Sequence, residues 1–410
     1  MLARAAGAAR PTDRDRQRDA LLAAAVASGS AALSLVPRVL FSADLLQRPW
    51  RFFGWSDIAL LWRDTQAGGH HLPFIDLYFP YPPIAGVISG LISLVVDDQT
   101  WFVVGWGVVG VLAAGIGGYL LAQACGLRRA LICWSCAPQV VLLSGANFDV
   151  VPAVMLLAGV IAAREGRRAR AAVFYALGTA TKLFPAVVAP LAPLADLRRG
   201  RIRRAFAVAT VFAGVVAVAY LPTALAPRSS LPFVGAYATV GSNEESIWGL
   251  VAIGFASNGG DASLVLLAIT SLGFVLTYFL LVVPRSIRNT DPAVGAAYAL
   301  VALLLWTRLY SPPFSIWLLP FFALLALRWR TLVLFAAADV AVFFTSYPLL
   351  LARTRDDPLP TPLIGLLMVS ILVRYAALFL TWRDIGRGAP RGLGSRSMSE
   401  GQLHPMISRR

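Results

Sequence analysis

The sequence has little of what soluble enzymes most often use for chemistry. Of its 410 residues only 3 are histidine and 3 are cysteine, and just 14% are charged. His70 and His71 stand in a glycine-rich segment with no carboxylate at helical spacing. Cys133 and Cys136 have CxxC spacing, but they lie in an apolar run with no further ligand nearby. We interpret these cysteines as packing residues and expect no metal site.

Motifs for nucleotide and hydrolase chemistry are missing as well. The sequence contains no GxxxxGK[ST] phosphate loop, no HExxH pair and no GxSxG nucleophile elbow. We therefore expect no cofactor and no soluble nucleotide donor. An activated donor, if the protein is an enzyme, should then be a lipid.

What the sequence does contain is mostly apolar. Hydrophobic residues make up 58% of the chain and the mean hydropathy is +0.70, above the roughly 45–50% apolar share of soluble domains. Long apolar runs recur from Leu21 to Trp382, which predicts an all-α, polytopic membrane bundle of about 12 spans in one domain, residues 21–382. The formal charge of +15 comes from arginine clusters between these runs. Such clusters set membrane orientation, so we expect no nucleic-acid partner.

The arginine clusters also predict which segments face each side of the membrane, because positive charge marks cytoplasmic ends. Residues 1–20 and a disordered tail, 383–410, are expected in the cytoplasm, and loops 44–100 and 227–262 outside the cell membrane. Pro83–Val96 is an apolar run of about 14 residues, short for a span. Counting it as one would place every later arginine cluster outside. We therefore expect a non-spanning external helix there.

Polar residues and aromatic rings gather in the predicted external segments, where loops held by a rigid frame carry sites. Asp57 follows Trp55-Ser56 and could serve as a general base, although a solvated face of a surface helix explains it equally well. Asp76, Tyr78 and Tyr81 belong to a proline-rich segment, which we interpret as a rigid lid or docking edge whose side chains bind substrate.

Two cations lie where the sequence predicts an anion site. Lys182 falls at a break between two short half-spans, Ala171–Lys182 and Phe184–Ala195, and a lipid phosphate is its natural partner, with snorkelling to the headgroups as the alternative. Arg308 is external against the positive-inside trend.

Further candidate residues surround these cations. Asn243, Glu244, Trp248 and Tyr310 add groups suited to sugar hydroxyls and ring faces. Helix capping explains Asn147 and Asp149 better than chemistry does. Asp339 lies in an apolar run, and the sequence indicates no partner for it.

The order of these motifs resembles the GT-C superfamily of polyprenyl-phosphate-sugar glycosyltransferases, specifically glycosyltransferase family 87 (the DUF2029 proteins of actinobacteria). Ser56-Asp57 is similar to the family's first-loop aspartate, Tyr81-Pro82-Pro83 to its YPP motif and Thr181-Lys182-Leu-Phe-Pro185 to its KxxP break. Asn243 to Trp248 is similar to its NxSxxG-type loop, and Ser311-Pro312 to Pro320 to its SPxxxxWLxP turn. No single motif is specific, but five in this order are.

The resemblance implies an inverting, metal-independent transfer of mannose, or of arabinofuranose, from a polyprenyl-phosphate carrier to an envelope glycan or glycolipid at the external face. It implies that Asp57 deprotonates the acceptor hydroxyl while Lys182 and Arg308 hold the leaving phosphate. Two departures stand out: the turn after Tyr310 lacks the histidines of the mannosyl branch, and Glu244-Glu245 replaces a Gln-Ser pair. A transporter or lipid flippase remains the main alternative.

Overall fold

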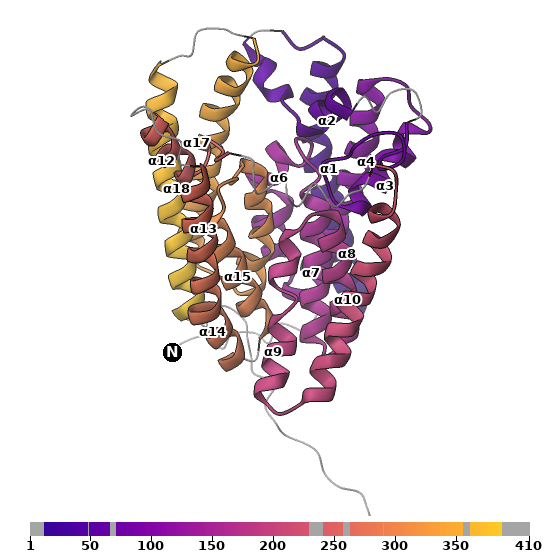
Figure 1. Cartoon of the computed structure of the whole chain (residues 1–410), viewed down its shortest axis with the longest axis vertical. Helices are drawn as coiled ribbons and strands as arrows, with labels where there is room; N and C mark the ends of the chain where they lie inside the picture. The colour runs from indigo at the N-terminus through magenta and orange to yellow at the C-terminus, as the bar shows by residue number, and fades with distance from the viewer. Residues whose placement is uncertain are drawn as a thin grey trace, which may run out of the picture.

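The structure is a computed structural model of the whole chain, and it describes residues 12–47, 49–65, 71–228, 241–256, 263–289, 291–355 and 361–387. Within these ranges the chain is a helical bundle, and the one extended pairing is an isolated bridge between Pro73 and Leu77. The predicted all-α membrane fold is confirmed. Figure 1 shows the long helices running side by side, with α2 and α12 toward one end of the bundle and α9 and α14 toward the other.

Six helices of the described part are long and apolar enough to cross a membrane: α1 (Asp13–Ser42), α4 (Gln99–Cys125), α10 (Ile202–Ala224), the continuous run of α13 (Ser263–Thr277), η4 (Tyr278–Val282) and α14 (Val283–Arg288), α17 (Trp329–Arg353) and α18 (Thr361–Arg387). A helix of ~20 residues is needed to cross the ~30 Å of hydrocarbon. The predicted number of about 12 spans is therefore not confirmed.

Ten shorter helices of the described part lie within the bundle, between the long ones. They are α5 (Leu127–Ala130), η2 (Leu131–Ser135), α6 (Pro138–Leu143), α7 (Val150–Arg164), α8 (Arg168–Thr181), η3 (Phe184–Val187), α9 (Leu191–Arg198), α15 (Pro292–Trp306), η5 (Pro312–Trp317) and α16 (Leu319–Leu324). The break predicted at Lys182 is present, because α8 ends at Thr181 and a separate 3-10 turn begins at Phe184. Helix ends therefore lie inside the bundle, where polar groups can gather.

Both predicted external segments contain helices that do not cross. The first holds η1 (Trp50–Gly54), α2 (Asp57–Thr65) and α3 (Pro83–Ser93), and the second holds α12 (Ile247–Ala256). With 11 residues, α3 is about 16 Å long at ~1.5 Å per residue, roughly half of a span. Residues 229–240 and 257–262 of the second segment lie outside the described residues.

The helical domain extends beyond the predicted boundaries at 21 and 382. Helix α1 begins at Asp13 because Thr12 caps it: the Thr12 hydroxyl accepts from the Asp15 amide, and the Asp15 carboxylate accepts from the Thr12 amide. Helix α18 continues to Arg387. Of the predicted tail, residues 388–410 lie outside the described part.

Ion pairs at helix ends join the short helices to the long ones. Arg164 of α7 makes two hydrogen bonds, of 2.7 and 2.6 Å, to Asp291, which precedes α15. Arg168 of α8 pairs with the buried Asp196 of α9. Arginines of the predicted clusters therefore also stabilise the packing of α7 against the start of α15 and of α8 against α9.

Small residues allow α1 and α4 to pack closely. A Cβ on Gly118 would lie 2.6 Å from the Ala23 carbonyl oxygen of α1, whereas a Cβ on Gly214 of α10 would meet nothing within 4 Å.

We expect Gly118→Ala to push α1 from α4 and to destabilise the fold by about 1–3 kcal/mol, the usual cost of overpacking. Gly214→Ala is the matched control, and it should be neutral or slightly stabilising because alanine favours a helix. Thermal unfolding in detergent, followed by tryptophan fluorescence, measures both. Equal melting temperatures for the two variants would contradict this account of the α1–α4 contact.

Candidate active site

A cavity of about 230 Å³ lies where the broken helices and the external segments meet. Its polar lining residues come from seven separate parts of the chain: Asp57, Tyr81, Asn147, Lys182, Asn243, Glu245, Ser311 and Tyr347. Its apolar lining residues are Trp55, Leu309, Phe314 and Leu350. All five sequence motifs therefore contribute to one cavity.

Asp57 is held at the cavity by the loop before α7. Its backbone amide donates to the Ala146 carbonyl at 2.9 Å, and the Ser56 hydroxyl accepts from the Ile58 amide at 3.2 Å, which caps the start of α2. The Asn147 side-chain amide donates to Asp57 Oδ2 at 2.7 Å. Asp57 Oδ1 has no hydrogen bond among the described residues, so this oxygen is available to a substrate.

The pKa of Asp57 is raised because its carboxyl group is removed from water. This desolvation raises the pKa to about 6, against the opposing attraction of Lys182, while the negative charge of Asp149 raises it and the Asn147 hydrogen bond lowers it. A carboxyl group with such a pKa is ionised at neutral pH and still basic enough to accept a proton.

Lys182 is the only lysine in the sequence, and it forms a buried ion pair. Its Nζ donates to Asp149 Oδ2 at 2.8 Å. The other Asp149 oxygen, Oδ1, accepts from Trp317 Nε1 at 2.7 Å. Asp149 is fully buried with both oxygens occupied, whereas Lys182 keeps two of its three N–H donors unpaired among the described residues. Lys182 can therefore bind a second anion.

Aromatic rings fix the position of the Lys182 ammonium. The Phe314 ring centroid lies 4.7 Å from Nζ and the Phe148 centroid 5.3 Å from it, distances at which a cation is attracted to a ring face. Trp317 lies between Phe184 and Phe314, with centroids 3.9 and 4.2 Å away and nearly parallel rings. The KxxP break and the SPxxxxW turn are thus packed directly on each other.

Four of the residues predicted for the site line the cavity: Asp57, Lys182, Tyr81 and Asn243. Tyr81 packs edge-on against Phe148, with ring centroids 5.0 Å apart. These side chains lie together although they are far apart in the sequence.

The other predicted residues are not among those that line this cavity. Asp76 is exposed and accepts from the Leu72 amide in a turn, and Tyr78 is exposed as well. Glu244 pairs with Arg353 at the surface. Trp248 donates to the Leu305 carbonyl and stacks on Trp306.

Arg308 and Tyr310 are buried beside the cavity wall. The Arg308 carbonyl accepts from the Asn243 amide at 2.8 Å and from the Ser246 hydroxyl at 2.9 Å, so Arg308 anchors the loop that carries Asn243. Tyr310 lies under the guanidinium of Arg374. A phosphate role for Arg308 stays a prediction.

The capping interpretation of Asn147 and Asp149 was wrong. Asp149 occupies the N-cap position of α7, but its side chain makes no capping hydrogen bond. Its carboxylate instead binds Lys182 and Trp317, and Asn147 binds Asp57. In the sequence, only the position of these two polar residues at the end of an apolar hairpin could have indicated a role in the site. Capping residues give the same pattern.

The arrangement combines a free carboxylate oxygen with a partly paired ammonium in one small cavity. It can take a proton from one ligand and stabilise negative charge on another. No cluster of three or more histidine, cysteine, aspartate or glutamate side chains suited to a metal ion occurs among the described residues.

Comparison with known proteins gives a family match. The model of glycosyltransferase family 87 matches residues 79–312. Among solved structures, the chain is similar to ArnT from Cupriavidus metallidurans in the apo state, with 13% identity, a TM-score of 0.39 and coverage of 88% of this chain and 72% of ArnT. For ArnT bound to undecaprenyl phosphate the identity is 12%, the TM-score 0.40 and the coverage 91% and 76%. No curated protein sequence matches.

Removing Lys182 alone should destabilise the protein, because it leaves the buried Asp149 carboxylate without a counterion. We expect Lys182→Met to cost about 3–5 kcal/mol and the double variant Lys182→Met/Asp149→Asn to recover most of that loss. Thermal unfolding in detergent measures the cycle. Arg353→Met breaks the exposed pair with Glu244 and should cost at most about 1 kcal/mol. Additive losses in the double variant would disprove the coupling.

Proposed function

Since the chain belongs to glycosyltransferase family 87 and is a multi-pass membrane glycosyltransferase, we propose that it transfers a sugar, mannose in the first place, from a polyprenyl-phosphate donor to a hydroxyl of an envelope glycan or glycolipid. The observation that carries the proposal is the cavity in which Asp57 and Lys182 stand together. The proposed site opens at the extracytoplasmic face of the cell membrane, and both termini lie in the cytoplasm.

Asp57 is the proposed general base. Its Oδ1 takes the proton of the acceptor hydroxyl while the acceptor oxygen attacks the anomeric carbon of the sugar. The bond between that carbon and the phosphate oxygen breaks, and its electron pair leaves with the polyprenyl phosphate. One displacement of this kind inverts the anomeric centre. Asp149 is unsuited to the role because both of its oxygens already accept hydrogen bonds.

Lys182 is the proposed partner of the leaving phosphate. Negative charge grows on the phosphate as the bond breaks, and a desolvated, preorganised cation stabilises that charge more than it stabilises the donor. Two of the Lys182 N–H groups are unpaired among the described residues, and the ion pair with Asp149 holds the ammonium group in position. Arg308 is proposed to assist, because it lies beside the cavity residues Leu309 and Ser311.

A lipid donor suits the surroundings of this cavity. The cavity lies among apolar helices, and the part of the chain that the structure describes has six helices long enough to span a membrane. Polyprenyl chains partition into such surroundings. The acceptor is proposed to be lipid-linked or a polysaccharide, and arabinofuranose is the alternative to mannose.

The proposal is tested with purified protein in proteoliposomes and two labelled donors, polyprenyl-phosphate mannose and polyprenyl-phosphate arabinose. We expect transfer of mannose to a membrane acceptor fraction. Transfer from the arabinose donor alone would show that the transferred sugar is arabinose rather than mannose. The reaction would still be the transfer of a sugar from a polyprenyl-phosphate donor. Movement of intact donor across the bilayer without transfer would show a flippase and overturn the proposal.

Asp57→Asn is the matched variant for this assay. It keeps the Asn147 contact within reach but removes the base, and a positioned base contributes about 10²–10⁴-fold to a rate. We expect a loss of that size with unchanged expression. Its melting temperature should not fall, since the folded protein stabilises the neutral form of Asp57. Full transfer by Asp57→Asn would disprove the base assignment.

The rate of transfer should depend on pH through Asp57. With a pKa of about 6, the carboxyl group is protonated and inactive below that pH, so activity should rise as pH increases through about 6 and then level off. The Asn147 hydrogen bond lowers this pKa, so Asn147→Ala should move the rise to higher pH. A pH profile of kcat/KM for both proteins measures the shift.

A matching control for this profile is Glu244→Gln, which changes a surface carboxylate paired with Arg353. It should leave the profile in place. If activity rises at the same pH in Asn147→Ala as in the wild-type protein, Asp57 is not the group whose protonation removes activity at low pH.

A further inference from the structure

The cavity contains a second acidic residue, to which the proposed chemistry assigns no role. Glu245 lines the cavity and is only 2% exposed. Its Oε2 accepts from the Asn243 side-chain amide at 2.8 Å. Its Oε1 is buried and makes no hydrogen bond of normal geometry among the described residues, and the hydroxyl of Ser346, which interacts with this carboxylate, has no hydrogen bond of normal geometry either. A buried carboxylate oxygen without a well-formed hydrogen bond is destabilising, so we expect a hydroxyl of a ligand in the cavity to supply a donor.

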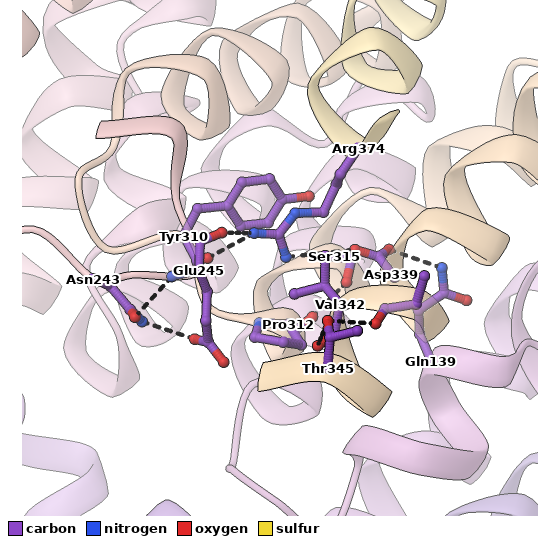
Figure 2. A network of polar contacts seen from close by, with 11 residues as sticks. Gln139, Asn243, Glu245, Tyr310, Pro312, Ser315, Asp339, Val342, Thr345 and Arg374 are labelled. Atoms are coloured by element: carbon purple, nitrogen blue, oxygen red, sulfur yellow. Dashed lines mark hydrogen bonds and ion pairs between the residues drawn. The ribbon is translucent and has the colours of Figure 1, made fainter. Parts of the chain in front are cut away.

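Glu245 is held at its position by contacts on both sides. The Asn243 side chain binds it twice, because Oδ1 also accepts from the Glu245 amide at 3.2 Å. Arg374 of α18 donates from Nη2 to the Glu245 carbonyl and, at 2.9 Å, to the Tyr310 carbonyl. Figure 2 shows the Arg374 guanidinium between Tyr310 and Asp339. The carboxylate is therefore preorganised rather than free to turn away.

The network behind Glu245 is buried in the bundle. Arg374 and Asp339 are 0% and 1% exposed, and their charged groups lie 3.7 Å apart. Gln139 donates to the second Asp339 oxygen at 3.0 Å (Figure 2). Asp339, whose partner the sequence did not indicate, thus balances the cation that anchors the loop. The buried pair of Arg374 and Asp339 therefore fixes the backbone of Glu245, which lines the cavity.

The charges in the cavity decide what Glu245 can bind. Lys182 supplies the positive end, and Asp57 and Glu245 supply carboxylates. A carboxylate repels phosphate, whereas an uncharged polyol donates hydrogen bonds to it. The cavity of about 230 Å³ is also smaller than the ~300–1,000 Å³ of usual ligand sites, which favours a single sugar unit over an oligosaccharide.

We infer that Glu245 accepts a hydrogen bond from a hydroxyl of the transferred sugar and thereby selects the sugar, with the phosphate of the same donor at Lys182. This inference rests on the proposed function and deepens it. Glu245 is a binding residue here, distinct from the base Asp57, and its loss should act on recognition of the sugar more than on recognition of the lipid phosphate.

The test compares binding of polyprenyl phosphate with binding of the same carrier bearing mannose, using purified protein in nanodiscs. The wild-type protein should bind the mannosylated carrier more tightly. Glu245→Gln removes the charged acceptor at nearly constant shape, and it should reduce that preference about tenfold or more, while affinity for the bare carrier stays within a factor of two. Glu244→Gln is the control, and it should keep the wild-type preference.

Deoxy-mannose carriers, each lacking one hydroxyl, identify the contact. The hydroxyl bound by Glu245 is the one whose removal weakens binding to the wild-type protein but not to Glu245→Gln. Should Glu245→Gln fail to fold, Glu245→Asp, which keeps the charge but shortens the side chain, provides the same comparison.

The outcomes separate this inference from the proposed function. If the wild-type protein binds both carriers equally, the proposed sugar donor is wrong, and both the proposed function and the role of Glu245 are overturned. If the wild-type protein prefers the mannosylated carrier but Glu245→Gln keeps that preference, only the role of Glu245 is overturned. An equal effect in Glu244→Gln would also overturn it, because it would show a general effect of charge.

Discussion

The buried ion pair between Lys182 and Asp149 constrains the rest of the site. An unpaired charge inside a helical bundle costs several kcal/mol, so these two side chains must meet for either to be tolerated. Their contact brings the break after α8 against the start of α7. Because Asp149 also accepts from Trp317, the turn after α15 joins the same point. One electrostatic requirement therefore assembles three segments that are distant in sequence.

The use of lysine here follows from its geometry. Every other basic side chain apart from the histidines is arginine, and many of these stand at helix ends. An arginine tends to bind a carboxylate with two parallel hydrogen bonds, which would commit its planar group to Asp149. A lysine ammonium is compact, fits between the Phe148 and Phe314 rings, and donates in three directions. It can hold Asp149 and still serve a ligand.

Much of the fold could be predicted from the sequence, but the contacts between side chains inside the site could not. Apolar runs located the long helices, and the short run at Pro83 and the Lys-Leu-Phe-Pro sequence indicated a non-crossing helix and a break, both of which the structure has. Periodicity and charge describe single segments, however, and they do not tell which helix ends meet. Asn147 and Asp149 were therefore assigned to capping, and the start of α1 at Asp13, which the Thr12 cap determines, was not predicted.

Glu244 and Glu245 show that the place of a residue in the site depends on its local contacts. The sequence offers two adjacent carboxylates, and only the Asn243 side chain and the Arg374 anchor determine that Glu245 faces the cavity while Glu244 meets Arg353. The positive end of the cavity is fixed by a different pair, Lys182 with Asp149, whose hydrogen bonds within the described residues run to each other and to Trp317 rather than to this loop. Changes in the loop can therefore alter the acidic end without disturbing the cation. In the proposed reaction, such separation would let the preference for the sugar vary while the stabilisation of the leaving phosphate stays the same.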